Sequence, residues 1–240
     1  MLELVLYLHF EYAEIHMRCS LLVVTTFLAT AVALAVADDE KKLTGTPGQR
    51  TPLPGTFQAW MVTGKHVGRF HSPVCETGLH PLALILCRDV NETDQPLIDL
   101  MKRLDQSLAK HAGVEPSAFV IFLRDGEFRE AVDKGGDDFN KKLARVSLDK
   151  EQLETKLKGL AKAKELGHIG LALASEQALT EYKLDEKAAV SVLLCHQQDV
   201  LARYDVPREK WTETEAGKIA DEFEKLLQAL DTPARARKKK

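Results

Sequence analysis

The chain has 240 residues, of which 45% are hydrophobic and 29% charged, and its formal net charge is −3 at pH 7. This near balance of charges excludes a protein that binds nucleic acid, or an acidic surface, through a large overall positive charge. The roughly 200 residues that follow the leader described next can bury a self-sufficient core as one domain.

Residues 1–37 are typical of an export signal rather than of a folded domain. From Met17 the sequence reads MRCSLLVVTTFLATAVALAVA, so that an arginine, an apolar stretch and small residues ending at Ala37 follow one another. Residues 1–16 contain three glutamates, which do not suit the start of such a signal, and we expect translation to begin at Met17. An uncleaved anchor is the alternative, but residues 21–37 are short for a bilayer span and rich in alanine and threonine. We expect cleavage after Ala37, no stable membrane insertion afterwards, and export to the periplasm, cell envelope or medium.

Two further segments flank the predicted domain, which spans residues 57–231. Residues 38–56 hold three prolines and three glycines without apolar periodicity, and this composition predicts a flexible linker. Residues 232–240 are short, basic and follow the last apolar periodicity, which predicts a solvated, disordered tail.

Within the domain, short apolar runs alternate with amphipathic stretches. The apolar runs predict strands at 57–62, 82–87, 118–123 and 168–174, and leucines spaced by three and four predict helices at 96–112 and 149–166, the second ending at Gly167. The polar residues 124–146 predict a loop with room for one helical turn. Two more apolar runs, at 190–194 and 200–204, flank the four residues 196–199 and predict a hairpin, and a last helix runs from 212 or 214 to 230. Parallel strands followed by an antiparallel pair predict a mixed sheet covered by helices on both faces.

This order of elements resembles the thioredoxin-like fold over roughly residues 80–230. The segment EYKLDEKAAVSVLLCHQQDVLARYDV (181–206) is similar to the hairpin region of exported thioredoxin- and peroxiredoxin-like domains, and MVTGKHVGRFHSPVCETGLHPLALIL (61–86) resembles a stretch of small secreted thioredoxin-like proteins of planctomycete-type bacteria. The resemblance implies an α/β, thioredoxin-like three-layer sandwich with a mixed central sheet and helices on both faces.

The resemblance also implies a Cys-x-x-Cys motif in the loop after the first core strand, where the amides of the next helix favour the thiolate. The loop here reads Asn91-Glu-Thr-Asp-Gln95 and contains no cysteine, and the family's cis-proline position falls at Ala188 or Ala189. Ordinary dithiol exchange is therefore not expected. Asn91-Glu-Thr93 matches a glycosylation pattern, but we favour a capping role for this loop at the start of helix 96–112.

Cys75 is the candidate catalytic residue, because Ser72-Pro-Val-Cys75 has dithiol spacing with serine in the first place. A lone thiol can attack a disulfide, but it lacks a resolving partner. We favour a structural loop cysteine, or one paired with Cys87 or Cys195. Cys87 itself lies in an apolar run and is expected in the core.

Four residues with imidazole or sulfur donors fall within a short stretch, namely His66, His71, Cys75 and His80. Zinc or copper uses such donors, but the spacing matches no compact ligand pattern, so these are weak metal candidates. His196 is predicted to be exposed in its hairpin turn, and Trp60 and Trp211 are predicted to be packing residues.

The sequence favours a non-catalytic binding or structural module over two alternatives. These are a single-cysteine thiol-disulfide oxidoreductase or peroxidase-like enzyme using Cys75, and a periplasmic metal-binding protein. No glycine-rich phosphate loop, Gly-x-Ser-x-Gly motif or aromatic-basic strip is present, and we expect no cofactor and no nucleic-acid partner. The expected partner is a protein that the sequence does not identify.

Overall fold

The structure is a computed structural model that describes residues 50–88, 91–124 and 138–231. Its strands are β1 (Thr51–Pro52), β2 (Ala59–Met61), β3 (Phe70–His71), β4 (Leu82–Cys87), β5 (Ser117–Arg124), β6 (Ile169–Ser175), β7 (Ala188–His196) and β8 (Asp199–Pro207). Its α-helices are α2 (Pro73–Thr77), α3 (Gln95–Lys110), α5 (Asp138–Ala163) and α6 (Glu213–Asp231), and its 3-10 helices are η1 (Ala112–Val114), η2 (Glu176–Tyr182) and η3 (Arg208–Lys210).

The described strands form one mixed sheet in the order β1-β8-β7-β4-β5-β6-β2-β3. β4, β5 and β6 are parallel neighbours, whereas β7 runs antiparallel to β4 and β8 antiparallel to β7. All six residues of β4 are buried, because this strand is flanked by strands on both sides and covered on both faces. The predicted parallel strands and terminal antiparallel pair are thus confirmed.

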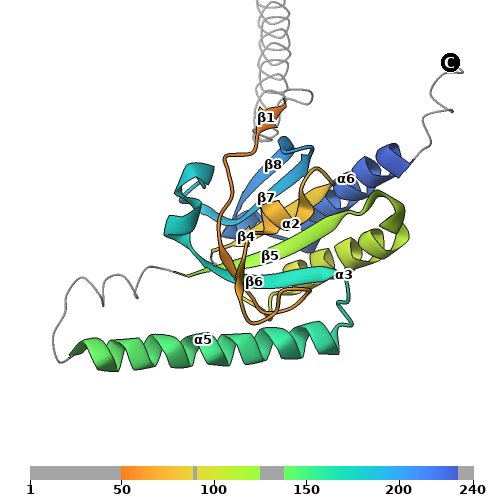
Figure 1. Cartoon of the computed structure of the whole chain (residues 1–240). Coiled ribbons are helices and arrows are strands. Elements are labelled where there is room, and N and C mark those ends of the chain that lie inside the picture. The colour runs from red at the N-terminus through yellow and green to blue at the C-terminus, as the bar shows by residue number, and fades with distance from the viewer. Residues whose placement is uncertain (1–49, 89–90, 125–137, 232–240) are drawn as a thin grey trace, which may run out of the picture. The chain divides into compact units, whose positions relative to one another are not determined.

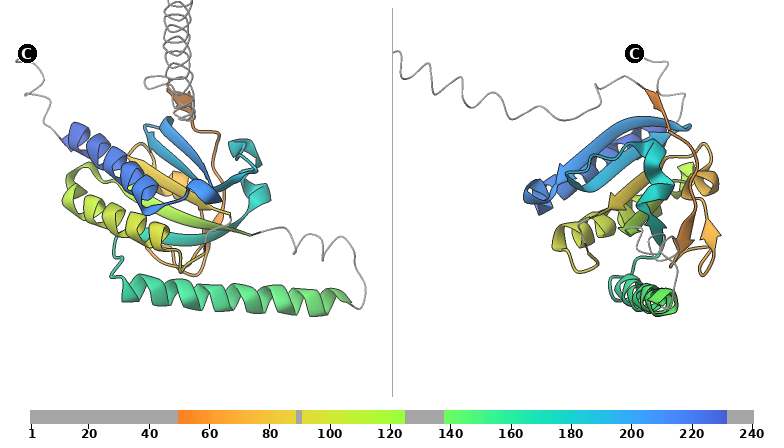
Figure 2. Two further views of the ribbon diagram at one scale, coloured as in Figure 1. Left: turned by 180° about the vertical axis from the view of Figure 1, so that it is seen from behind. Right: turned by 90° about the vertical axis from the view of Figure 1, so that its left-hand side faces the viewer.

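Alternate residues of the central strands point into two separate hydrophobic clusters, one on each face of the sheet. Ala83 and Ile85 contact the cluster that contains the buried residues of α3, α5 and α6, whereas Leu82 and Leu84 contact the cluster that contains residues of α2 and η2. Figure 1 views the sheet from the side of α2, and the left view of Figure 2 shows α3 and α6 over the opposite face. The result is a three-layer arrangement in which the long helices share one face.

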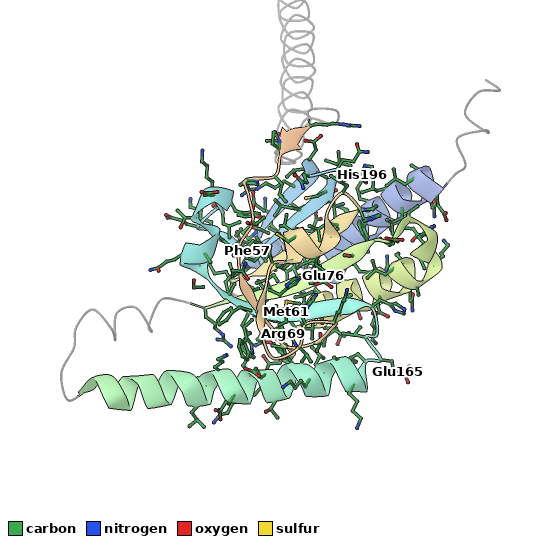
Figure 3. All side chains as sticks on the ribbon, in the orientation of Figure 1. Phe57, Met61, Arg69, Glu76, Glu165 and His196 are labelled. Atoms are coloured by element: carbon green, nitrogen blue, oxygen red, sulfur yellow. The ribbon has the colours of Figure 1, made fainter. Side chains whose placement is uncertain are left out.

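The helix α5 begins earlier than the sequence predicted. It starts at Asp138, so the predicted loop 124–146 was wrong for its last nine residues, in which Phe139, Leu143 and Val146 have the i, i+4, i+7 spacing of a helix. The helix also ends differently: Glu165 takes the left-handed conformation (φ 56°), and the Leu166 N–H donates to the Ala161 carbonyl at 2.9 Å. Gly167 is therefore not the residue that stops this helix, and Figure 3 marks Glu165 beside the helix end.

Part of the predicted linker 38–56 is held against the domain. Thr51 pairs with Val200 in β8, and the Tyr182 hydroxyl donates to the Gly55 carbonyl at 2.7 Å. The predicted signal at 1–37, the linker as far as residue 49 and the basic tail at 232–240 lie outside the described residues. In the part of the chain that the structure describes, no helix has the length and apolar character to cross a bilayer.

The predicted hairpin is confirmed, with a tighter turn than the four residues expected. His196 pairs with Asp199, so that only Gln197 and Gln198 form the loop. Both have positive φ, 56° and 63°, which is the backbone of a type I′ turn and matches the twist of the flanking strands.

Replacing Gly170 by alanine should destabilise the domain by about 1–3 kcal/mol, because a Cβ there would lie 2.4 Å from Cδ1 of Phe119 on the neighbouring strand. Urea unfolding measures the loss. Gly159→Ala is the matched control, because Gly159 lies inside α5 with open space around it. That substitution should stabilise the helix by up to about 1 kcal/mol. Equal effects of the two substitutions would contradict the close approach of the Phe119 ring.

Candidate functional site

The carboxyl end of β4 is where open α/β sheets place their chemistry, and here Arg88 fills it. Its backbone N–H donates to the Ala189 carbonyl at 2.9 Å. Its guanidinium donates to the carbonyls of Asp185 and Ala188, at 2.6 Å and 3.2 Å, and forms an ion pair with Glu176. One arginine thus holds the start of β7. Thioredoxin-like domains carry a cis-proline at this place, whereas every peptide bond that the structure describes here is trans.

The polar loop that follows β4 has a structural role centred on Asp94. Its Oδ1 accepts from the backbone N–H of Leu97 at 3.2 Å and from Nε1 of Trp211 at 2.8 Å, and its Oδ2 accepts from Arg208 at 2.6 Å. The side chain is only 5% exposed. The predicted capping role is confirmed, with Asp94 as the N-cap of α3.

Asn91 organises the loop locally rather than facing a ligand. Its Oδ1 accepts from both the backbone N–H and the hydroxyl of Thr93, at 3.0 Å and 2.8 Å. Such Asx bonds are typical of turns that lead into a helix.

The two cysteines of the sheet are buried. Cys87 is the last residue of β4, where burial and then the charge of Asp94 raise the pKa of its thiol. Burial raises the pKa of Cys195 in β7 to about 12. Since the thiolate is the reactive form, both thiols are unreactive at neutral pH. Cys87 is in the core, as predicted.

Cys75 differs from the sequence prediction in two respects. It lies on the short helix α2 rather than in a loop, and it is exposed and free, so the predicted pairing with Cys87 or Cys195 is wrong. Ser72 caps this helix, accepting the Cys75 backbone N–H at 3.3 Å, and Pro73 occupies its first turn. The chain then enters β4 at the end opposite to the Arg88 loop.

The structure brings together two of the four weak metal candidates, His66 and His71, and places Glu76 beside them. The rings of His66 and His71 are stacked with centroids 3.6 Å apart. Oε2 of Glu76 lies 3.5 Å from Nε2 of His71 and 4.0 Å from Nε2 of His66. Among the described residues these three form a group whose donor atoms lie close enough for one metal ion, and Cys75 and His80 are not part of it. His80 instead lies 3.3 Å from the carboxylate of Glu115.

Sequence reasoning missed Arg88 and a second arginine that fixes the connection into β7. The guanidinium of Arg203 donates to the carbonyls of Tyr182 and Lys183, each at 2.9 Å, and to the carboxylate of Asp205 at 2.7 Å. No local motif signals these long-range bonds. His196, predicted to be exposed in the turn, is the half-buried last residue of β7, and burial followed by the charges of Arg50 and His80 lowers its pKa.

No family model and no curated protein matches the chain. Among solved structures, a variant of Xanthomonas campestris peroxiredoxin Q is similar with 8% identity and a TM-score of 0.48, covering 78% of this chain and 100% of that one. A Corynebacterium diphtheriae DsbF homologue has 11% identity and a TM-score of 0.43, covering 76% and 96%. A secreted Mycobacterium tuberculosis disulfide oxidoreductase homologous to DsbE has 10% identity and a TM-score of 0.41, covering 69% and 95%.

The chain's own topology defines its fold. A βαβ unit, β4-α3-β5, lies beside an antiparallel hairpin, β7-β8, that is followed by the helix α6. Helices cover both faces of this mixed sheet. The described domain is a thioredoxin-like α/β sandwich.

Proposed function

We propose that this chain is an exported thioredoxin-like domain that acts as a non-catalytic binding or structural module. The observation that carries the proposal is the state of the loop after β4, where the Asp94 carboxylate has three donors and is buried. A dithiol site needs an exposed nucleophile at this place, whereas this loop is tied to Arg208 of η3 and to Trp211, which directly follows η3.

The remaining thiols fit the same proposal. Cys87 and Cys195 are buried with raised pKa values, and Cys75 lies on α2, which leads into the other end of β4. Export is supported by the residue pattern from Met17 to Ala37.

Cys75 supports a second candidate function, because it is the exposed cysteine of the three that the structure describes. As a thiolate it can attack one sulfur of a disulfide, forming a mixed disulfide and releasing the other sulfur as a thiolate. Resolution of that mixed disulfide requires a second thiol from another molecule, such as glutathione.

An insulin-reduction assay with dithiothreitol separates the two candidates. We expect the rate with protein to equal the rate without it, because the loop after β4 supplies no thiol. We also expect iodoacetamide to label Cys75 at pH 6 no faster than it labels a cysteine in a short peptide.

Cys75→Ser is the informative variant, and Cys195→Ser is its matched control in the buried sheet. Catalysed reduction that disappears in Cys75→Ser and persists in Cys195→Ser would overturn the non-catalytic proposal. It would establish the single-cysteine enzyme instead.

A further inference from the structure

We propose that His66, His71 and Glu76 form a site for one divalent transition-metal ion, with zinc as the best fit. Three side chains from three consecutive elements converge, and their donor atoms all lie within 4.8 Å of one another. The two imidazoles and one carboxylate are a ligand set that zinc uses when a further coordination position stays open. This inference is independent of the non-catalytic role proposed above.

The first support is that two donor atoms of the cluster lack partners. Nε2 of His71 and Oε2 of Glu76 are both shielded from solvent, and neither has a hydrogen-bond partner. Leaving such atoms unpaired costs about 1–3 kcal/mol each, and a bound cation would satisfy both of them together. The two atoms lie 3.5 Å from each other, which is an ion-pair distance without hydrogen-bond geometry.

The second support is the spacing of the donors. Zinc binds imidazole nitrogen and carboxylate oxygen at about 2.0–2.2 Å, so two donors of a tetrahedral ion lie about 3.3–3.5 Å apart. The His71–Glu76 separation is already 3.5 Å, and the His66–Glu76 separation of 4.0 Å exceeds that range slightly. Binding of one ion by both imidazoles requires the stacked rings of His66 and His71 to rotate apart, because the lone pair of each ring nitrogen lies in the plane of its ring.

The third support is the scaffold that presents the ligands. His66 lies in the turn between β2 and β3, which is closed by the Gly68 N–H donating to the Met61 carbonyl at 2.8 Å. Thr63 fixes the same turn to β6, because its hydroxyl accepts from Leu171 N–H at 2.8 Å. The position of Met61 and Arg69 in the segment beside β6, and of Glu76 on α2, can be followed in Figure 3.

His71 and Glu76 are also presented by regular elements, the strand β3 and the helix α2. His71 pairs with Ala59 in the β2-β3 ladder, and α2 is fixed by its Ser72 cap and by the Thr77 hydroxyl, which donates to the Pro73 carbonyl at 3.0 Å. A metal ion at this point would therefore cross-link the β2-β3 hairpin to α2.

The ligand chemistry also sets the selectivity. Imidazole favours zinc, copper and nickel, whereas magnesium and calcium prefer sites made of oxygen donors. The three side chains are between 22% and 28% exposed, so the ion could enter from solvent and keep a water ligand.

Zinc titration of the purified protein against a chromogenic chelator tests the site. We expect one zinc ion per chain, with no competition from magnesium or calcium at millimolar concentration. His71→Ala and Glu76→Gln should each weaken zinc binding by at least about 100-fold, because each removes one of three ligands. On zinc addition, long-range nitrogen NMR should show shifts at the ring nitrogens of His66 and His71.

His80→Ala and Cys75→Ser are the matched controls, since both residues flank the cluster without belonging to it. Both should bind zinc as the unmodified protein does, and thermal melts without metal should show that Glu76→Gln remains folded. The absence of saturable zinc binding would overturn the proposal. So would weaker binding in His80→Ala or Cys75→Ser with unchanged binding in Glu76→Gln.

Discussion

Replacing Asp94 by alanine should lower the free energy of unfolding by about 2–4 kcal/mol. Alanine removes the N-cap of α3, which is worth about 1 kcal/mol, and leaves the indole N–H of Trp211 buried without a partner, which costs about 1–3 kcal/mol. Trp211 is only 5% exposed, so water does not readily replace the carboxylate. Urea unfolding followed by tryptophan fluorescence measures the loss.

Two variants separate the parts of this effect. Asp94→Asn keeps an acceptor for Leu97 and Trp211 and should lose less stability, because asparagine caps helices about as well as aspartate. Arg208→Ala should cost under about 1 kcal/mol, since the Arg208 side chain is 57% exposed and its ion pair is screened by water. A loss in Asp94→Ala no larger than that in Arg208→Ala would show that the buried bond to Trp211 contributes little.

This network gives the loop after β4 a structural role that does not depend on cysteine. The capping role of the loop was predictable, because Asp94-Gln-Pro96 has the residue types of a helix start. The bond to Trp211 was not, because 117 residues separate the two partners and no local periodicity reports such a contact. Trp211 was predicted only as a packing residue.

The central sheet was predictable for a simple reason. Strands buried on both faces are continuous apolar runs, as in Leu82–Cys87, and a strand of that kind is visible without any alignment. The β3 strand has two residues and α2 has five, which is too short for either to show a period. The early part of α5 was missed because its polar residues were interpreted as a loop.

The group of His66, His71 and Glu76 shows that the sequence reveals candidate ligand types but not which side chains converge. His66 and His71 were identified by residue type, together with Cys75 and His80, but Glu76 was not among the predicted ligands because only imidazole and sulfur donors were considered. Consecutive residues on a helix point about 100° apart, so only one of the neighbours Cys75 and Glu76 can face the histidines. After Gly78, whose φ is 63°, the chain turns away and His80 lies beside Glu115 instead.

Raising the pH from 6 to 9 should weaken the packing of α6 on α3 through His111. This residue is 4% exposed; its Nδ1 lies 3.0 Å from Asp231, and its Nε2 lies 3.1 Å from Glu224. Burial alone would lower the pKa of His111, but the hydrogen bonds to the two carboxylates outweigh burial and the charge of Lys110 and raise it. The stabilisation is therefore complete below about pH 6.5 and is lost as the pH rises through the raised pKa of the folded protein.

Glu224 sets the lower end of the pH range in which the contact between α3 and α6 is most stable. Burial would raise its pKa, but hydrogen bonds from Lys110, Ser107, His111 and Gln228 hold the pKa far below its usual range. Its contribution is thus present above about pH 4.5 and is lost as the pH falls toward the pKa of the folded state. The helix pair should be most stable between about pH 4.5 and 6.5, the unperturbed pKa values of the two groups.

Urea unfolding between pH 5 and 9 measures this effect. At pH 6, His111→Gln should be destabilised by about 2 kcal/mol, the contribution typical of hydrogen bonds to charged groups, and its stability should change less between pH 6 and 9. His168→Gln is the matched control, because His168 lies 3.2 Å from Asp105 but its side chain is 55% exposed. It should retain the pH dependence of the unmodified protein, because exposed ion pairs contribute little. The same pH dependence in His111→Gln as in the unmodified protein would mean that the proton on His111 does not hold the two helices together.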